Sequence, residues 1–276
     1  MSYHAEKSRL RQRHEQMIYW SSIALDVTLP RDKSGVYVLG YVKSGTNWLC
    51  NLLSDVLDMP VLEPWTLTWP QIKPCVYHMH RFIPVDSVRR RTVYIMRDGR
   101  DTLVSKYFHL VREGGEVKTQ FERELRRPLL AEEIQENMPE FILFMQKIRV
   151  SSTDYRSHLE EWKRHADKYI TVRYEVLLIH PEVELMRVLE GLTHHTASLA
   201  KVKKAVNRHD FSALTNRKKG EQDLGSFNRK GISGDWRNYF TPESAKAYDS
   251  YAGDLLLETG YETDRQWWRM PLRLVG

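Results

Sequence analysis

A strand, a glycine-containing loop and a helix follow one another near the start of the chain. The stretch from position 38 to position 48 reads VLGYVKSGTNW, in which apolar residues lead into Gly40 and Gly45. Leucine and valine then recur at helical spacing, at positions 49, 52, 53, 56 and 57. Unpaired N–H groups at the start of a helix attract anions, and Gly45 lets the backbone come close to one. This order predicts an α/β fold that binds a phosphate compound at the loop.

The loop differs from the one that binds nucleoside triphosphates. Gly40 and Gly45 match the spacing of G-x-x-x-x-G-K-[ST], but Thr46 and Asn47 follow the second glycine, and Lys43 lies before it. The loop therefore lacks the usual lysine and the usual ligand of Mg²⁺. A nucleotide kinase of the same fold would need Mg²⁺ and a nucleoside triphosphate, so the altered loop argues against that alternative.

The loop instead resembles the 5′-phosphosulfate loop P-K-S-G-T-T-W of cytosolic-type sulfotransferases. Val42 replaces the proline and Asn47 replaces the second threonine, although an asparagine amide still donates to phosphate. The resemblance implies that the loop holds the donor 3′-phosphoadenosine 5′-phosphosulfate (PAPS), with Lys43 stabilising the leaving phosphate. The residues that inherit donor binding are Lys43, Ser44, Gly45, Thr46, Asn47 and Trp48. An accidental Gly-Ser-Thr turn is the alternative for this stretch alone.

Two histidines stand two positions apart in the stretch VYHMHRFIP, which begins at Val76 and reads as a short strand. In an extended chain His78 and His80 point to the same side. They could form a metal pair, but no third ligand is evident, and we expect no metal. The stretch resembles the sulfotransferase pattern K-[TS]-H-L-P, which implies that His80 is the catalytic base. His78 stands where the family often has lysine.

A second strand is predicted at 92–96, and the residues after it resemble the family motif Y-x-x-R-[ND]-x-x-D-x-x-V-S. The resemblance implies that Arg97 and Ser105 bind the 3′-phosphate of the donor. In the family this serine also holds the catalytic lysine away until acceptor binds, which gives Ser105 a catalytic role as well. Asp101 is predicted to cap the helix that follows. A structural salt-bridge network would explain Arg97 and Asp101, but not the full spacing.

Two aromatic residues further along resemble the family's adenine contacts. Tyr174 closes a predicted strand at 169–175 and resembles the tyrosine of Y-E-D-L. Phe211 takes the place of the phenylalanine in S-F-x-x-M, where it would sandwich adenine with Trp48. The structural alternatives are a strand-end tyrosine that anchors the loop for Tyr174 and core packing for Phe211, and the acidic Asp210 beside Phe211 weakens that local match.

The stretch FNRKGISGDWRNYFT, at 227–241, closely resembles the family's R-K-G-x-x-G-D-W-[KR]-x-x-F-T. The resemblance implies that Arg229, Lys230 and Gly231 close over the 3′-phosphate, because glycine lets the backbone approach and the cations pair with the anion. A basic turn before a helix would explain three residues, but not the whole run.

The rest of the chain gives weaker signals. The charged stretch 113–137 predicts a solvated helix face or a mobile loop. The aromatic and proline-rich loop 63–70 could line an acceptor pocket, and plain packing explains it equally well. Cys50 and Cys75 are expected to be buried free thiols in a reducing compartment.

Together these features predict one α/β domain over 1–276, with a central parallel sheet flanked by helices. The family resemblance covers 36–261, after an N-terminal segment 1–34. It implies a PAPS-dependent sulfotransferase that releases 3′-phosphoadenosine 5′-phosphate (PAP). The acceptor is expected to be a small-molecule alcohol, phenol or amine.

Partners and location follow from composition. No signal peptide or membrane span is visible, and a cytoplasmic location is expected. The formal charge of +6 suits an anionic ligand. Basic clusters at 201–204 and 217–219 would suit a non-enzymatic nucleic-acid binder, but no base-reading module accompanies them, and no nucleic-acid partner is expected. A homodimer and an inactive family member both stay open.

Overall fold

The computed structural model describes residues 17–28, 35–63, 73–148, 154–192 and 195–269. Its internal contacts divide the chain into two compact units. The first unit comprises Met1–Gly40, Gly45–Met96 and His165–Asp210, and the second comprises Tyr41–Ser44, Arg97–Arg164 and Phe211–Gly276. The loop that follows the first strand therefore belongs partly to each unit.

The first unit is built on a five-stranded parallel sheet, as the sequence predicts. The strands lie in the order β2-β3-β1-β4-β5, with every neighbouring pair parallel. Their bounds are β1 Val36–Leu39, β2 Val61–Leu62, β3 Val76–Met79, β4 Thr92–Met96 and β5 Ile170–Arg173. Every residue of β1, β3 and β4 is buried, because these strands lie inside the sheet.

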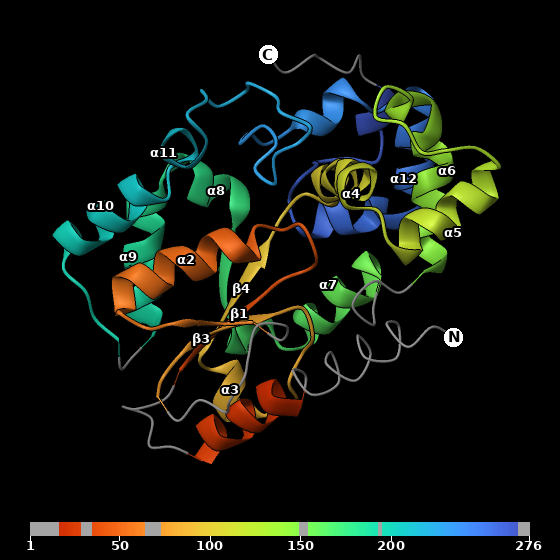
Figure 1. Cartoon of the computed structure of the whole chain (residues 1–276). Helices are drawn as coiled ribbons and strands as arrows, with labels where there is room; N and C mark the ends of the chain where they lie inside the picture. Colours follow the sequence, from red (N-terminus) through yellow and green to blue (C-terminus); the bar gives the residue numbers. More distant parts are fainter. Residues whose placement is uncertain (1–16, 29–34, 64–72, 149–153, 193–194, 270–276) are drawn as a thin grey trace, which may run out of the picture. The chain divides into compact units, whose positions relative to one another are not determined.

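Helices cover both faces of this sheet. Figure 1 shows α2, α9 and α10 on one side of the strands, and α3 with a helix over residues 17–28 on the other. The bounds are α2 Thr46–Leu57, α3 Asp86–Arg89, α8 Tyr174–Ile179, α9 Pro181–Gly191 and α10 Leu199–Arg208, with the 3₁₀ helix η2 at Ala166–Lys168. The α/β class predicted from the sequence is confirmed.

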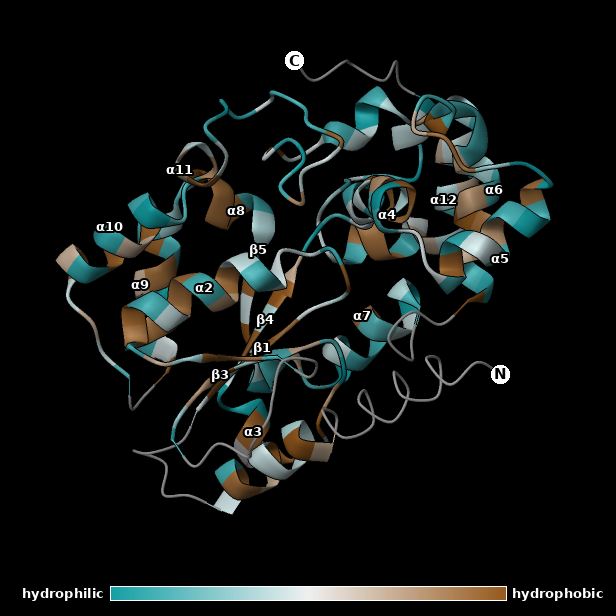
Figure 2. Cartoon of the chain, viewed as in Figure 1, coloured by the Kyte–Doolittle hydropathy of each residue, from teal (hydrophilic) through white to brown (hydrophobic). Residues whose placement is uncertain are grey.

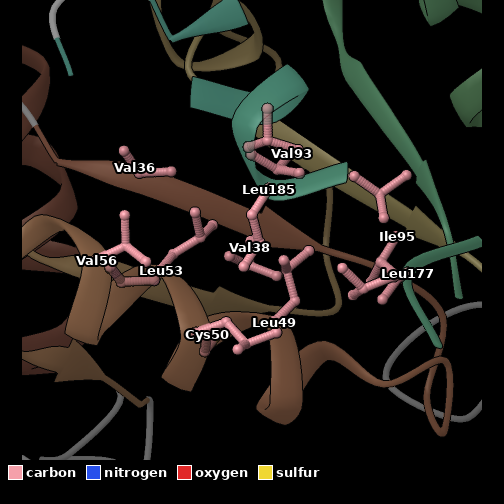
Figure 3. Packing of buried hydrophobic residues seen from close by; sticks show 14 of the residues in the cluster. Val36, Val38, Leu49, Cys50, Leu53, Val56, Val93, Ile95, Leu177 and Leu185 are labelled. Carbon is pink, nitrogen blue, oxygen red and sulfur yellow. The ribbon is translucent and has the colours of Figure 1, made fainter. Parts of the chain in front are cut away.

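The core of the first unit lies between the sheet and α2, α8, α9 and α10. Alternate residues of β1 and β4 point into it, as shown by Val36, Val38 and Ile95 in Figure 3. Leu49 and Leu53 of α2 meet them from the helix side, at the spacing that the sequence indicates. Figure 2 shows the same central strands as mostly hydrophobic.

The opposite face of the sheet carries tyrosines. Tyr37 and Tyr77 are stacked with ring centroids 4.7 Å apart. Asp26, on the helix over residues 17–28, accepts from the Tyr37 hydroxyl at 2.6 Å and from Arg91 at 2.7 Å. Buried polar groups need such partners, so this network fixes the first strand against its covering helix.

The second unit is helical. Its elements are α4 Gly99–Glu113, α5 Glu116–Leu125, α6 Ile134–Lys147, α7 Tyr155–Arg164, α11 Phe211–Thr215, η3 Asp235–Asn238, α12 Pro242–Glu258 and η4 Trp267–Arg269. Helix α12 starts at a capping box, in which Thr241 and Ser244 satisfy each other's backbone N–H groups. Phe121, Phe141 and Phe144 pack together between α5 and α6.

Several sequence expectations need correction. The strand predicted at 169–175 ends at Arg173, and Tyr174 opens α8 instead of closing the strand. This strand is half-buried rather than buried, because it lies at the edge of the sheet. Within 113–137 the solvated helix is confirmed: α5 buries Phe121 and exposes most of its charged residues. Residues 64–70 of the predicted acceptor loop lie outside the described residues.

A buried arginine holds three parts of the second unit together. The Arg100 guanidinium lies 3.8 Å from the ring centroid of Trp236 and 4.6 Å from that of Trp267. It also pairs with the carboxylates of Asp98 and Glu262. Only 1% of its surface is exposed. The planar guanidinium fits this stacked, doubly paired site, which a lysine would not.

Arg100→Met is expected to lower the free energy of unfolding by about 3–5 kcal/mol, because it leaves two carboxylates without their buried partner. Chemical denaturation followed by circular dichroism measures the change. Arg164→Met is the matched control: Arg164 is exposed and pairs with the surface residue Glu161, so its loss should change stability by less than about 1 kcal/mol. Equal effects of the two substitutions would contradict the structural role of Arg100.

Candidate active site

The loop between β1 and α2 has the backbone of an anion-binding turn. Lys43 and Gly45 both have positive φ, at 68° and 94°. A lysine in the left-handed region is uncommon and carries strain, which functional loops often keep. The buried Ser44 donates its N–H to the carbonyl of Tyr41 at 3.1 Å. The half-buried Asn47 lies in the first turn of α2.

Tyr174 packs directly on the loop glycine. A Cβ at Gly45 would lie 2.7 Å from the Tyr174 ring, so only glycine fits here. The same ring meets Trp48 edge-on, with centroids 5.8 Å apart. The Trp48 indole donates to the carbonyl of His209 at 3.1 Å. The structure thus brings together three residues of the first unit that the sequence predicts to bind donor.

His80 is held in one tautomer. Its Nδ1 lies 2.7 Å from the carbonyl oxygen of Gly40. A carbonyl only accepts hydrogen bonds, so Nδ1 carries a proton, and in the neutral imidazole the lone pair lies on Nε2. A neutral imidazole with its lone pair on Nε2 can take a proton from an acceptor at that atom. The rings of His78 and His80 lie 4.8 Å apart, which confirms that both point to the same side.

His78 has a different setting from its neighbour. It is buried, with Nε2 2.9 Å from the hydroxyl of Thr46, the first residue of α2. Its Nδ1 lies 3.8 Å from the carboxylate of Glu63. Burial, and secondarily the nearby His80, lower the pKa of His78 to about 3. His78 is therefore neutral near pH 7 and fixes the threonine side chain of the loop.

His78→Phe is expected to remove part of the protein's acid sensitivity. The folded-state pKa lies below the ordinary value of 6.5, so the unfolded chain binds a proton that the folded chain does not. The stability linked to His78 is thus lost as pH falls from about 6.5 towards 3. The difference in unfolding free energy between wild type and His78→Phe should shrink by about 2 kcal/mol between pH 7 and pH 5.

Denaturant titrations at the two pH values measure this difference. His180→Phe serves as the control, because His180 is exposed and its loss should leave the pH dependence unchanged. If the wild type and His78→Phe lose stability in parallel, His78 is not held neutral by the fold.

The sequence placed the cap of α4 wrongly. Asp98, not Asp101, is the capping residue, and its carboxylate accepts from the backbone N–H of Arg100 at 2.9 Å. The helix begins at Gly99, so Asp101 lies inside the first turn. From there its side chain reaches another segment of the chain.

Asp101 joins the second and third sequence motifs. Its carboxylate accepts from the N–H groups of Gly234 at 2.7 Å and Trp236 at 2.9 Å. Burial raises the pKa of Asp101 to about 6, although Arg97, at 3.8 Å, acts in the opposite direction. Arg97 also donates to the carbonyl of Lys43 at 3.1 Å. One carboxylate and one guanidinium therefore hold three predicted donor-binding segments of the second unit in place.

The R-K-G segment is organised around Asp235. Arg229 and Lys230 both pair with this carboxylate, the lysine at 2.7 Å. Burial alone would raise the pKa of Asp235, but the two cations bring it below its usual value. Gly231 has a φ of 66°, and a Cβ there would lie 2.4 Å from the ring of Phe211. The segment is thus preformed by its own ion pairs.

Lys43 lies in a strongly cationic environment. Its ammonium lies 4.3 Å from the centroid of the Phe227 ring. Burial, and secondarily the nearby Arg112 and Lys106, lower the pKa of Lys43 to about 7. Ser105 is half-buried on α4, and within the described part of the chain its hydroxyl forms no hydrogen bond to Lys43. In this structure the lysine rests on an aromatic ring, and the serine switch stays a prediction.

The predicted site residues divide between the two units. The first unit contains Gly45, Thr46, Asn47, Trp48, His80 and Tyr174. The second contains Lys43, Ser44, Arg97, Ser105, Phe211, Arg229, Lys230 and Gly231. Sequence reasoning missed Asp235 and Phe227, although both stand in the quoted FNRKGISGDW run. An acidic residue three places after R-K-G-x was the available signal for the first.

The structure also describes the basic cluster at 217–219 and the two cysteines. Arg217 donates to the backbone carbonyls of Glu221, Asn228 and Arg229, so one basic cluster braces a loop. Cys50 and Cys75 are buried free thiols, as expected. No group of three potential metal ligands occurs among the described residues. In the same residues, no helix is long and apolar enough to cross a membrane.

Comparison with known proteins identifies the family. Residues 78–260 match the family described as the sulfotransferase domain. The mouse protein named Sulfotransferase 2B1 is 25% identical over 264 residues, which cover 83% of this chain and 73% of that protein. Cytosolic sulfotransferase 3 of Arabidopsis thaliana is 26% identical over 252 residues, covering 80% of this chain and 76% of that protein.

Solved structures share the fold. The crystal structure of mouse sulfotransferase SULT7A1 complexed with PAP has a TM-score of 0.60 and 19% identity, covering 86% of this chain and 88% of that one. Retinol dehydratase in complex with androsterone and the inactive cofactor PAP has a TM-score of 0.55 and 17% identity, covering 83% and 81%. The family match spans more than half of the sequence, and the chain therefore belongs to the sulfotransferase domain family.

Proposed function

We propose that this enzyme transfers a sulfuryl group from PAPS to a hydroxyl or amine of a small-molecule acceptor. The observation that carries the proposal is the tautomer of His80, whose Nδ1 proton is held by the carbonyl of Gly40. A histidine whose Nδ1 is held by a backbone carbonyl and whose Nε2 carries the lone pair in the neutral ring, together with a phosphate-binding loop that has an offset lysine, suits sulfuryl transfer. The loop does not suit transfer of a γ-phosphate.

The reaction follows from the groups available. Nε2 of His80 removes the proton of the acceptor O–H or N–H as the acceptor atom attacks sulfur. The new bond to sulfur forms while the bond from sulfur to the bridging phosphate oxygen breaks. Its electron pair stays on that oxygen, which leaves as part of PAP. Lys43 stabilises the negative charge that grows there, and Ser105 restrains the lysine until acceptor is bound.

The donor contacts are assigned residue by residue. Around the 5′-phosphosulfate we place Lys43, Ser44, Gly45, Thr46 and Asn47. For the 3′-phosphate we propose Arg97, Ser105, Arg229, Lys230 and Gly231. Adenine is assigned to Trp48, Tyr174 and Phe211. The preformed Arg97 and Arg229 ion pairs support these roles, because a phosphate can replace a carboxylate in each.

The proposed acceptor class and cellular location rest on what the names of similar proteins say. Androsterone in the retinol dehydratase complex is a small hydroxylated molecule, which supports a small-molecule alcohol or phenol as acceptor here. The name of the Arabidopsis protein supports a cytoplasmic location. We also propose that 1–276 acts as one functional domain, because the matched residues 78–260 include segments of both units.

A transfer assay tests this function. The purified protein is incubated with PAPS, EDTA and a mixture of phenols, alcohols and amines, and PAP and sulfated products are measured by mass spectrometry. Stoichiometric formation of PAP and one sulfated product, undiminished by EDTA, is the expected result. PAP binding without product from any acceptor would identify an inactive family member, and a requirement for Mg²⁺ with ATP would favour a kinase.

A further inference from the structure

Helix α4 carries a row of basic side chains beyond the family motif. Lys106, His109 and Arg112 follow one another at steps of three, which places successive members side by side on the helix surface. All three are half-buried. The guanidinium of Arg112 lies 5.6 Å from the centroid of the Phe227 ring, on which the ammonium of Lys43 also rests, at 4.3 Å. Lys43, Lys106, His109 and Arg112 together form a group that we call the cationic cluster.

The members of the cluster repel one another. Burial, and secondarily the nearby Lys43, Lys106 and Arg112, lower the pKa of His109 to about 4. Burial also lowers the pKa of Lys106. Arg112 and Lys106 in turn depress the pKa of Lys43. Gathering half-buried cations in this way is unfavourable unless a counter-charge is present.

Little in the described part of the chain neutralises the cluster. Among the described residues, Lys43 and Lys106 form no ion pair, and His109 Nδ1 is buried without a hydrogen-bond partner. Glu113 pairs with Arg112 at 2.7 Å, but its side chain is 54% exposed. Arg97, Arg229 and Lys230, by contrast, each face a buried carboxylate. Across the described ranges, the cluster therefore has no buried counter-anion of this kind and is suited to bind one.

The proposed donor does not account for the whole cluster. Ser105 and Phe108 lie about one turn apart on α4. The Arg229 guanidinium lies 4.4 Å from the centroid of the Phe108 ring, so this face of α4 is the one assigned to the 3′-phosphate. Lys106 and His109 each lie one position further, so they are turned by about 100° around the helix. Lys106 and His109 on that second face interact electrostatically with Lys43, where the proposed transfer of the sulfuryl group takes place.

Resting on the proposed function, we infer that the acceptor of this enzyme is itself an anion. Lys106 and Arg112 bind a carboxylate, phosphate or sulfate group of the acceptor, and His109 donates or accepts a hydrogen bond beside it. The transferred sulfuryl group and the bonds that form and break are those given above. The negative group of the acceptor also compensates the repulsion around Lys43 when both substrates are bound.

Matched acceptors with and without charge test this inference. 3-(4-Hydroxyphenyl)propanoate and its methyl ester carry the same phenol, and 4-hydroxyphenyl phosphate and sulfate extend the test to other anions. Binding to the PAP complex is measured by calorimetry, and kcat/KM is measured with PAPS. The best anion is expected to exceed the ester at least tenfold in both measurements.

Charge removal identifies the residues responsible. Lys106→Met and Arg112→Gln should each reduce the preference for the anion about tenfold, with affinity for PAP unchanged. Lys163→Met, which removes an exposed lysine paired with Glu258, is the control and should leave the preference intact. The inference is overturned if no anion binds better than the ester, or if the Lys106 and Arg112 variants weaken PAP binding instead. Absence of PAP binding in the wild type would instead refute the proposed function.

Discussion

His80→Gln is expected to lower kcat by about 10²- to 10⁴-fold, the usual contribution of a general base. Glutamine has no group that can take up a proton near pH 7, so the acceptor would attack without proton removal. His80 is half-buried and its Nδ1 contacts a backbone carbonyl, to which a glutamine amide can also donate, so the fold should survive the change. Single-turnover transfer from PAPS measures kcat, and calorimetry with PAP should show donor affinity within about twofold of the wild type.

His180→Gln provides the matched control, because it changes an exposed histidine of the same unit in the same way. It should leave both kcat and PAP affinity unchanged. Turnover that does not respond to loss of His80 would remove its assignment as the base. Such a result, with donor binding intact, would point to an inactive family member or a different proton acceptor.

Lys43→Met is expected to lower kcat by about 10²- to 10³-fold, the range seen when one preorganised group for transition-state charge is removed. Methionine keeps an unbranched stem beside Phe227 but has no charge to offer the leaving phosphate oxygen. Rapid-quench measurement of PAP formation isolates this step. Full turnover in Lys43→Met would show that another cation of the cluster stabilises the leaving group.

Lys43 also predicts a pH dependence of donor binding. Its pKa in the ligand-free protein is lowered to about 7, so above that pH most of the lysine is neutral. An anionic nucleotide favours the charged form, so PAP binding should take up a proton between pH 7 and the ordinary lysine pKa near 10.5. Affinity should therefore fall as pH rises from 7 to 9.

Calorimetry in buffers with different ionisation enthalpies counts this proton. In Lys43→Arg the charge is permanent, so proton uptake from this position should disappear and affinity should become less dependent on pH. Unchanged proton uptake in Lys43→Arg would assign the titration to another group, with Lys106 the next candidate because burial also lowers its pKa.

The sequence was sufficient where local pattern decides the structure. β4 runs from Thr92 to Met96 as predicted, and α9 starts at Pro181, which fits the first position of a helix. The same holds for α2, whose buried leucines follow helical spacing. In these elements the apolar period and the terminal residues point to the same answer, so long-range contacts are not needed to identify them.

The sequence was insufficient where a side chain makes its contacts with a distant segment of the chain. Asp101 is of a residue type that often caps helices, but Asp98 is the capping residue of α4. The Asp101 carboxylate instead accepts from backbone N–H groups more than 130 positions away. Tyr174 reads as part of a strand, yet it opens a helix that covers Gly45. Such outcomes depend on tertiary packing, which overrides local propensity.

The candidate site shows the same division. The motifs locate Lys43, His80 and Arg229 on the sequence, since each stands at a distinctive spacing. The motifs do not reveal that the carbonyl of Gly40 fixes the tautomer of His80, or that the Lys43 ammonium lies over the Phe227 ring. Both contacts join segments that are far apart in the chain. The environment of a site residue, and hence its protonation, requires the folded structure.

The most direct test of the account is calorimetric titration with PAP in the absence of magnesium, beside ATP with magnesium, repeated on Arg229→Ala. A donor site of the proposed kind should bind PAP tightly without metal, should bind the nucleotide lacking the 3′-phosphate far more weakly, and should lose affinity for PAP in the variant. Binding of ATP with magnesium, and no binding of the 3′-phosphorylated nucleotide, would contradict the assignment of a PAPS-dependent sulfotransferase.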